Sequence, residues 1–417
     1  MIEFTLTEEQ TMLQRTLRDF VNKEIKPIVL ERESIADPME RFPWDIVVKL
    51  SRMGIRTMAL SKELGGSGAD VLTCCLVGEE LAVGDLGIAV IMDQTWKWVW
   101  FDESMNDEQR SRFLLPFLQD DTYLLGMGST EPDADKGYEY FGPSNQTGTG
   151  PRTTARRDGN GGWVINGRKA FISNGSVAKL YVIQARTDMS KGGSEGVSAF
   201  LVPADTPGFT IGRVHDKIGQ RLINNAELYF SDCWVPEANL LGPEGLSIAA
   251  VFGYKRRGRS NAQAAATTLG VGRAAFEAAV NYASSRVQGG KPIIQHQVIG
   301  TMLADMAIEL EAARNLIWRA AWSVDHLDQV GVYLLPYRDA AIQLGGANPL
   351  PSMAKVFTSE VAVRACLKAM EIYGGFGIMR EVGMEKYLRD AVTFLHSDGA
   401  NQVLRLRIAE LLASQVV

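Results

Sequence analysis

Apolar positions recur with helical spacing over the first 122 residues of the 417-residue chain. The first stretch opens with a capping box, in which Thr7 is followed by Gln10, and Pro27 interrupts it. Its apolar positions are Leu13, Leu17, Phe20, Val21 and Ile25. The stretches 41–54 and 107–118 show the same pattern, so residues 1–122 are predicted to form a helical domain.

The pattern changes to short runs of β-branched and aromatic residues from residue 123 to residue 238. Gly, Asn, Asp and Pro separate these runs, which is typical of strands joined by turns. The runs are WVING, YVIQAR, VSAFLVP, FTIG and AELYFSD. We therefore expect a central β-domain over 123–238, with a long turn-rich insert at 133–152.

Long helical patterns return in residues 239–417. The stretch 261–286 carries small residues suited to close helix packing, and 299–324 has an apolar stripe opposite its charges. Strands and helices do not alternate, and the sequence shows no repeat. The prediction is an α+β protein with a helical domain, a β-domain and a helical bundle.

Composition narrows the function classes. The chain is 46% hydrophobic with a net charge of -6, which argues against a nucleic-acid or anionic-membrane partner. Its first ten residues, MIEFTLTEEQ, lack the features of a signal peptide, and no apolar run reaches the length of a membrane span. The four cysteines are scattered without zinc-ligand spacing. We expect a cytoplasmic protein without a membrane span or a metal site.

Several motifs occur in an order typical of one enzyme family. The stretch 371–390, EIYGGFGIMREVGMEKYLRD, resembles the C-terminal signature of the acyl-CoA dehydrogenases. NGRKAFISNG at 166–175 resembles their flavin-contacting segment, and KIGQR follows at 217–221. The stretches 286–297 and 302–314 resemble their bundle helices. The resemblance covers the whole chain and implies an N-terminal helical domain, a central β-domain and a C-terminal four-helix bundle, in a homotetramer with one FAD per subunit.

One flavin motif departs from the family pattern. The family usually has TEPxxGSD, whereas this chain has TEPDADK at 130–136. Asp135 and Lys136 replace the Gly-Ser pair that would approach the FAD diphosphate, and a carboxylate there is unfavourable. We expect this loop to bind FAD in a different way, with Lys136 or the basic stretch 151–157 compensating for the charge.

The resemblance implies a catalytic base at Asp398, in TFLHSDGANQVLR at 393–405. Oxidation of a thioester by a flavin needs a base for the α-proton while the β-hydrogen leaves as hydride to flavin N5. The family usually has Glu there, and Asp is shorter by roughly 1.5 Å. The family's other location for a catalytic Glu, within 254–263, holds no acid.

The local sequence alone favours a different role for Asp398. An Asp before Gly-Ala at the start of a helix is a common N-cap, and one residue could fill both roles. Arg405 would lie two turns later on the same helical face and is expected to keep the carboxylate ionised. Gly399, which follows Asp398, is expected to contact the substrate.

A second candidate acid lies in GIAVIMDQTWKWVW at 87–100. Asp93, Trp96, Lys97 and Trp100 share one helical face, so a carboxylate and two indoles would line a substrate cavity. Asp93 could then act as a second acid or base, as in relatives that oxidise ring-containing thioesters. In the alternative interpretation the tryptophans belong to the core and Asp93 pairs with Lys97.

The resemblance also implies the residues that hold FAD. Thr130 and Ser173 would donate to the flavin ring, Phe171 would pack against it, and Gln402 would lie near the cofactor. Four further residues would contact the FAD of a neighbouring subunit: Arg286, Gln297, Gly374 and Gly375. Taken singly, Arg286 could be a solvated helix end and the glycines a simple turn.

The densest basic cluster is Lys255, Arg256, Arg257 and Arg259. Arg256 and Arg259 are candidate contacts for the phosphates of coenzyme A. The alternative is a solvated helix start, although cations there oppose the helix dipole.

Three functions remain open from the sequence. The first is an FAD-dependent acyl-CoA dehydrogenase, acting on acyl groups that include bulky or alicyclic ones, with an electron-transfer flavoprotein as acceptor. The second is an enzyme like nitroalkane oxidase, a member of the same superfamily, with Asp398 as base and oxygen as acceptor; DGAN and GPRTTAR resemble it. The third is a non-catalytic family member without FAD.

Overall fold

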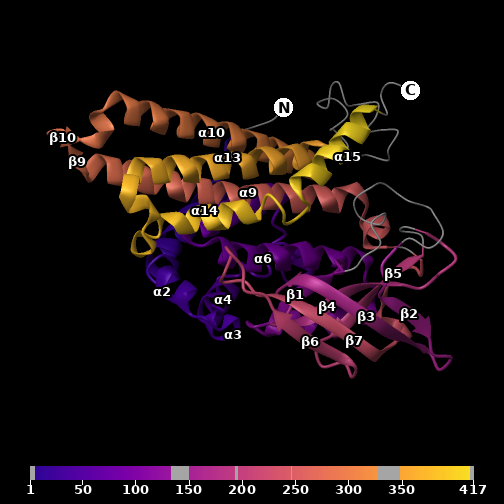
Figure 1. The fold of residues 1–417 in the computed structure, drawn as a ribbon. Coiled ribbons are helices and arrows are strands. Elements are labelled where there is room, and N and C mark those ends of the chain that lie inside the picture. The colour runs from indigo at the N-terminus through magenta and orange to yellow at the C-terminus, as the bar shows by residue number, and fades with distance from the viewer. Residues whose placement is uncertain (1–4, 133–149, 193–195, 246, 327–347, 414–417) are drawn as a thin grey trace.

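The computed structural model describes residues 5–132, 150–192, 196–245, 247–326 and 348–413. The side chains of residues 100, 248–257 and 410–413 lie outside this description. Figure 1 shows the long helices of the bundle in one layer, with α6 between them and a twisted sheet. The order along the chain is helical domain, β-domain and helical bundle, which confirms the predicted fold class.

The N-terminal domain consists of helices and short helical turns. Thr7 caps the first helix as predicted, because its hydroxyl accepts from the Gln10 N–H at 3.1 Å and the Gln10 side chain accepts from the Thr7 N–H at 3.1 Å. A π-helical turn continues this helix before Pro27. The elements are α1 (Glu8–Phe20), η1 (Val21–Ile25), α2 (Val29–Ser34), α3 (Pro38–Arg41), α4 (Trp44–Arg52), η2 (Lys62–Leu64), α5 (Val71–Gly84), α6 (Leu86–Val99), η3 (Trp100–Ser104), α7 (Asp107–Gln109), η4 (Arg110–Leu114) and α8 (Leu115–Gln119).

The β-domain is an eight-stranded sheet in the described residues, with strand order β6-β7-β3-β2-β4-β5-β8 and β1 paired to β4. The pairs β1–β4 and β2–β4 are parallel and the others antiparallel. The strands are β1 (Leu124–Gly128), β2 (Thr154–Arg157), β3 (Gly162–Ser173), β4 (Ala178–Arg186), β5 (Val197–Pro203), β6 (Phe209–Val214), β7 (Asn225–Pro236) and β8 (Leu240–Leu241). A turn, η5 (Glu237–Asn239), precedes β8, so the sheet extends past residue 238.

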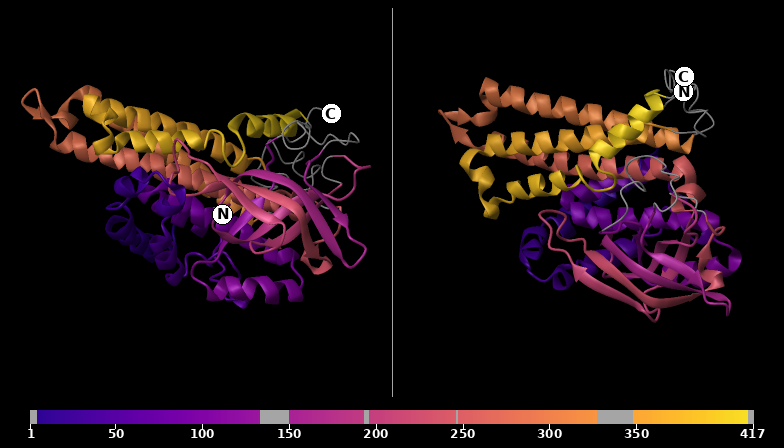
Figure 2. Two further views of the ribbon diagram at one scale, coloured as in Figure 1. Left: turned by 60° about the horizontal axis from the view of Figure 1, so that its bottom comes forward. Right: turned by 45° about the vertical axis from the view of Figure 1, so that its right-hand side comes forward.

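The bundle consists mainly of long helices that run side by side (Figures 1 and 2). They are α9 (Ile248–Ser285), α10 (Gln297–Asp325), α13 (Leu350–Tyr373), α14 (Met384–Thr393) and α15 (Asn401–Ala413). A small hairpin, β9 (Val287–Gln288) and β10 (Lys291–Pro292), and the turn η6 (Ile293–Gln295) join α9 to α10. The turns η7 (Gly374–Ile378) and η8 (Arg380–Val382) join α13 to α14.

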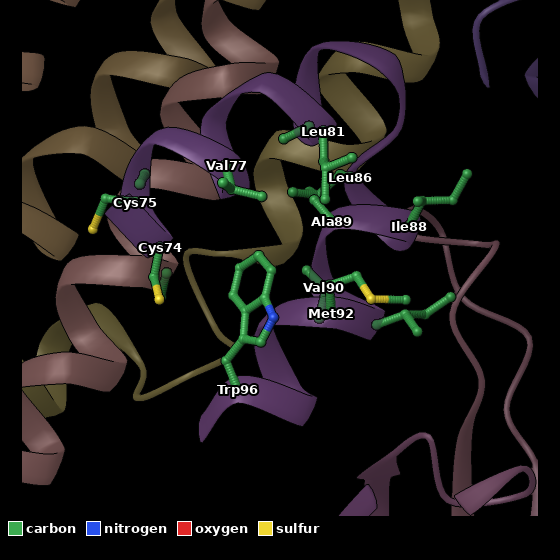
Figure 3. Close-up of a cluster of buried hydrophobic side chains, with 14 of the residues drawn as sticks. Cys74, Cys75, Val77, Leu81, Leu86, Ile88, Ala89, Val90, Met92 and Trp96 are labelled. Atoms are coloured by element: carbon green, nitrogen blue, oxygen red, sulfur yellow. The ribbon is translucent and has the colours of Figure 1, made fainter. Parts of the chain in front are cut away.

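Helices α5 and α6 are the buried centre of the helical layers. Their side chains interlock in one apolar cluster, which includes Cys74, Val77, Leu81 and Met92 (Figure 3). Trp96 is fully buried in this cluster, and its indole N–H donates to the Ile55 carbonyl at 2.7 Å. Because α6 also contacts α9 and β1, it connects the bundle to the sheet.

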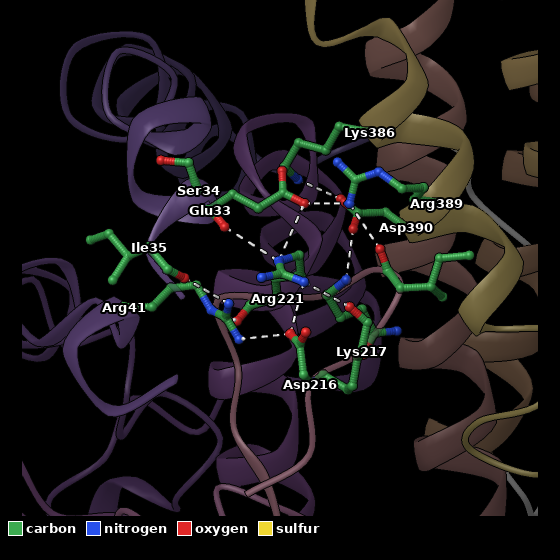
Figure 4. Close-up of polar contacts among 12 residues, drawn as sticks. Glu33, Ser34, Ile35, Arg41, Asp216, Lys217, Arg221, Lys386, Arg389 and Asp390 are labelled. Atoms are coloured by element: carbon green, nitrogen blue, oxygen red, sulfur yellow. Dashed lines mark hydrogen bonds and ion pairs between the residues drawn. The ribbon is translucent and has the colours of Figure 1, made fainter. Parts of the chain in front are cut away.

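Buried charges join all three domains at one place (Figure 4). Lys386 of α14 pairs with Asp390 and, at 2.7 Å, with Asp85, which precedes α6. The backbone N–H of Gln220, between β6 and β7, donates to Asp390 at 2.7 Å. Arg389 pairs with Glu33 of α2. The β6–β7 connection is therefore held against α14, a short distance along the chain before Asp398.

Candidate active site

Asp398 lies in the connection between α14 and α15, in an unusual backbone conformation. Its φ angle is 52° and that of Gly399 is 90°, a region that residues other than glycine rarely adopt. Such outliers persist where the surrounding structure enforces them, and they cluster at functional sites. This conformation separates Asp398 from the helix that follows.

A buried lysine holds this connection in place. Lys355 of α13 donates to the carbonyls of Phe394 at 2.6 Å and Gly399 at 2.7 Å, and to Asn401 Oδ1 at 3.0 Å. Burial lowers the pKa of Lys355 to about 8, although the Asp398 carboxylate acts in the opposite direction. Lys355 thus supplies the hydrogen bonds that the irregular backbone around Asp398 needs.

The predicted N-cap is wrong. Helix α15 begins at Asn401, so Ala400 precedes it rather than Asp398. The Asp398 carboxylate instead accepts hydrogen bonds from α6: Gln94 Nε2 lies 3.3 Å from Oδ1, and Lys97 Nζ lies 3.1 Å from Oδ2. The carboxylate is directed to the centre of the molecule and not to the end of its own helix.

The expected support from Arg405 is also wrong. Arg405 pairs with Glu360 of α13 at 2.7 Å. The helical spacing from 398 to 405 fails because Asp398 lies before the helix with a positive φ angle. The cation beside Asp398 is Lys97, which the sequence analysis did not assign to the base.

Asp93 and Lys97 form the predicted pair one helical turn apart, at 2.6 Å. Asp93 is fully buried, and burial raises its pKa to about 7, with the Asp398 carboxylate raising it further and Lys97 lowering it. Burial lowers the pKa of Lys97, but Asp398 and Asp93 outweigh it, so this pKa lies above its usual value. Two carboxylates therefore share one buried ammonium.

The tryptophans do not form the proposed cavity face within the described side chains. Trp96 lies in the core, which agrees with the alternative interpretation of this helix, and the Trp100 side chain lies outside the described residues. Of the four residues on that face, the structure brings Asp93 and Lys97 to Asp398.

On the β-domain, Phe171 is exposed and strained. Its φ angle is 60°, which is exceptional for a bulky residue, and its side chain is 60% exposed. Its ring lies 4.9 Å from that of His215, with the two planes 31° apart. An aromatic residue held in this way offers a flat surface to a planar ligand.

Hydroxyl groups flank Phe171. Ser173 Oγ accepts from Asn225 Nδ2 at 3.2 Å, so its O–H can donate to a ligand. The carbonyl of Thr130 accepts from the Ala170 N–H at 2.9 Å, which fixes the end of β1 beside β3. The exposed ring of Phe171 and the hydroxyl of Ser173 suit contacts with a flavin ring, and the backbone of Thr130 lies beside Ala170, next to Phe171.

Glu131 of the same TEP motif has a structural role. Its carboxylate pairs with Lys169 at 2.6 Å and accepts from the backbone N–H groups of Arg152 at 2.6 Å and Thr153 at 3.1 Å. Burial raises the pKa of Glu131, but Lys169 and these donors outweigh it, and the net shift is downward. Residues 133–149, with the altered part of TEPDADK, lie outside the described residues.

The remaining candidates lie in other parts of the molecule. Arg286, Gln297, Gly374 and Gly375 are exposed, near the hairpin β9–β10 and the turn η7. In Figure 1 this is the end of the bundle away from β3. These four residues therefore lie apart from Phe171 within one chain. This separation agrees with the expectation that they contact the FAD of a neighbouring subunit. Gln402 is exposed on α15.

Of the four side chains in the basic cluster, the structure describes only that of Arg259. Arg259 lies 3.6 Å from Glu103 in an ion pair. The side chains of Lys255, Arg256 and Arg257 lie outside the described residues. The phosphate-binding role of Arg256 and Arg259 stays a prediction.

A carboxylate in the connection between α14 and α15 and a flat aromatic surface on the sheet suit a flavin-dependent dehydrogenase, which needs a proton acceptor and a site for a planar cofactor. Three domains of one family match the chain: acyl-CoA dehydrogenase N-terminal domain over residues 7–121, middle domain over 126–233 and C-terminal domain over 258–413. The chain belongs to the acyl-CoA dehydrogenase family. It is an FAD-dependent oxidoreductase that acts on CH–CH bonds.

Individual relatives match over nearly their full length. An acyl-CoA dehydrogenase of Bacillus subtilis is 35% identical over 98% of both chains. The structure of butyryl-CoA dehydrogenase from Megasphaera elsdenii is 32% identical, with a TM-score of 0.84 over 99% of this chain and 100% of that one. A structure described as electron transferring flavoprotein of Acidaminococcus fermentans is also 32% identical, with a TM-score of 0.83 over 99% of both chains.

These matches show that the third alternative, a non-catalytic family member without FAD, is wrong. Within the described part of the chain, none of the helices combines the length and the apolar character needed to cross a bilayer.

Proposed function

We propose that this protein removes hydrogen from Cα and Cβ of an acyl-CoA thioester, with Asp398 as the base. The observation that carries the proposal is the contrast within the carboxylate pair: the Asp398 side chain is 19% exposed, whereas that of Asp93 is 0% exposed. Asp398 can meet a ligand directly, and Asp93 cannot do so in this conformation.

The base acts from a fixed position. Lys355 and the positive φ angle define the backbone of Asp398, and two donors of α6 define its side chain. A carboxylate with fixed geometry loses little freedom when it takes a proton from carbon, which favours proton transfer. FAD, when bound, supplies the acceptor for the hydride that leaves Cβ.

Thr130, Phe171 and Ser173 would hold the flavin ring. The Asp93–Lys97 pair stays behind Asp398, so Asp93 acts on the base and does not replace it. Because the Asp398 side chain is short, the acyl Cα must come close to the connection between α14 and α15. This limits how the thioester can lie in the site. The short-chain relative from Megasphaera elsdenii supports an acyl-CoA substrate.

An electron-transfer flavoprotein is the acceptor that we propose, supported by the description of the Acidaminococcus fermentans structure. We also propose a homotetramer, in which Arg286, Gln297, Gly374 and Gly375 contact the FAD of a neighbouring subunit; their exposure and their place at the end of the bundle away from β3 support this. An oxygen-dependent enzyme of the nitroalkane oxidase type is the competing outcome of the experiment below.

The test is anaerobic reduction of the FAD-loaded protein by a panel of thioesters from butyryl-CoA to branched and ring-containing acyl groups, followed by loss of flavin absorbance. Asp398→Asn should slow reduction by about 10²- to 10⁴-fold, the range for loss of a general base, with FAD still bound. Reduction by nitroethane and not by thioesters would instead favour the oxidase.

Asp232→Asn is a matched control. Asp232 also has a positive φ angle, 49°, but it lies on β7, where one oxygen accepts from Asn166. This variant should reduce at the wild-type rate. If Asp398→Asn does so too, Asp398 is not the base.

A further inference from the structure

Helix α6 contacts both oxygens of the Asp398 carboxylate, through an amide at position 94 and an ammonium at position 97. Gln94 Nε2 also lies 3.3 Å from Asp93 Oδ2. An amide and an ammonium, one helical turn apart, therefore link the same two carboxylates.

The burial of this group is unusual for so many charges. The Lys97 side chain is only 4% exposed. A buried ion pair costs several kcal/mol per ion in desolvation, and an apolar pair would often serve stability as well. Stability alone is thus a poor explanation for a buried Lys97, whereas the placement of Asp398 explains it.

We propose, on the basis of the function proposed above, that Lys97 is a positioning residue for Asp398 and that Asp93 anchors Lys97 and balances its charge. Lys97 contacts the Asp398 carboxylate at 3.1 Å, and Asp93 contacts the same ammonium at 2.6 Å. Asp93 thereby supplies the countercharge that a buried ammonium needs. The two contacts together keep Lys97, and through it Asp398, in one position.

An unsatisfied atom supports the second role. Among the described residues, Asp93 Oδ1 is buried and has no hydrogen-bond partner. A carboxylate with a bare oxygen in the interior gains from taking up a proton, in agreement with the pKa of about 7 that burial gives Asp93. Asp93 can therefore change its charge near neutral pH while Lys97 remains charged.

The other ionisable groups near this pair do not remove its effect. Lys355 approaches Asp398 from α13 and is bound to Phe394, Gly399 and Asn401. The thiols of Cys74 and Cys75 approach Asp93 from α5, and burial raises the pKa of each so that they stay neutral. Asp93, Lys97 and Asp398 are the charges that the test must separate.

The experiment compares Lys97→Met and Asp93→Asn in the FAD-loaded protein, by the pH dependence of flavin reduction by a thioester. Loss of Lys97 removes a positive charge from Asp398, so the acid limb of the rate profile should move up by about one pH unit. Asp93→Asn should leave the limb unchanged below about pH 7, where Asp93 is already neutral in the wild type, and should lower the rate above about pH 7, where its charge anchors Lys97. Lys97→Met should also slow reduction at least about tenfold, because the base is misplaced.

Lys49→Met provides the matched control, since Lys49 pairs with Glu24 at 2.6 Å on the surface, and it should keep the wild-type profile. If Lys97→Met does not fold, the double variant with Asp93→Asn removes both groups, and its limb should also move up by about one pH unit. Lys97→Arg should restore part of the rate.

A second readout needs no thioester. Infrared difference spectra identify the carboxyl band of Asp398, because Asp398→Asn removes that band, and the band can then be followed as the pH changes. Its titration should move up in Lys97→Met and stay in place below about pH 7 in Asp93→Asn. If no thioester reduces the flavin of the wild-type protein but the Asp398 titration still moves in Lys97→Met, the proposed substrate is wrong and the positioning role stands. A limb and a titration in Lys97→Met that coincide with those of the wild type, with an unchanged rate of reduction, would overturn the positioning role.

Discussion

At the scale of single residues, the site depends on charges that are buried in unequal degrees. Asp93 is fully buried, Asp398 is partly exposed, and both contact Lys97. A carboxylate that cannot reach water favours its neutral form, whereas a partly exposed one beside an ammonium can stay ionised. In the proposed function these two identical side chains therefore have different tasks.

This asymmetry predicts a pH-dependent cost to stability. Burial raises the pKa of Asp93 from 3.8 to about 7 in the folded state, so its contribution to stability is fully present below about pH 4 and is lost as pH rises to about 7. Compared with Asp93→Asn, the free energy of unfolding of the wild type should fall over this interval, by at most about 4 kcal/mol.

Chemical denaturation of both proteins across that pH range measures the difference. Above about pH 7 the two curves should run parallel, because Asp93 is then ionised in both the folded and the unfolded states. A difference that is constant from acid to neutral pH would show that Asp93 titrates at its ordinary value.

At the scale of elements, close packing of α5 against α9 keeps α6 in place. Gly270 of α9 faces the α5 backbone, where an added Cβ would lie 2.3 Å from the Glu79 carbonyl oxygen and 2.7 Å from the Ala82 Cβ. No heavier residue fits at this point without moving a helix. The glycine therefore sets how near the two helices come, and α6 follows directly after α5.

Substitution of alanine for two helical glycines should have opposite effects. Gly270→Ala should destabilise the protein by about 1 to 3 kcal/mol through overpacking. At Gly300 of α10 the nearest atom to an added Cβ is the Ile294 carbonyl oxygen at 3.8 Å, so Gly300→Ala should raise stability by up to about 1 kcal/mol. Thermal unfolding of both variants tests this, and equal melting temperatures would contradict it.

Local patterns predicted the elements well and the site only in part. The capping box at Thr7 was visible because its partners are three residues apart. The bond between Lys97 and Asp398 joins residues 301 positions apart, and no local period reports such a contact. Arg405 was assigned wrongly because helical spacing was extended to Asp398, where the chain has already left the helix. The Asp93–Lys97 spacing was the one local signal of the buried cluster.

At the scale of the whole molecule, one end of the bundle is apolar and exposed. Phe376 is 58% and Ile378 is 64% exposed in η7, beside Gly374 and Gly375. Exposed apolar clusters of this kind are typical of surfaces that contact another protein chain. In the proposed homotetramer this end meets the neighbouring subunit and its FAD.

The variant with both Phe376→Ser and Ile378→Ser should therefore dissociate and lose FAD together. Analytical ultracentrifugation measures the assembly, and flavin absorbance per chain measures the cofactor. Met12→Ser, at an exposed apolar position on α1, is the control and should change neither. An intact tetramer with full flavin content in the double variant would place the subunit contact elsewhere.

The ionic junction of the three domains has a consequence for how the enzyme can diverge. Phe171 rests against His215, the β6–β7 connection continues to Gln220, and Gln220 is bound to Asp390 on the helix that leads to Asp398. The spacing between the aromatic surface and the proposed base is thus transmitted through buried polar contacts. Residues around the acyl group can change during evolution while this spacing is conserved, so new substrates need no new alignment of the reacting groups.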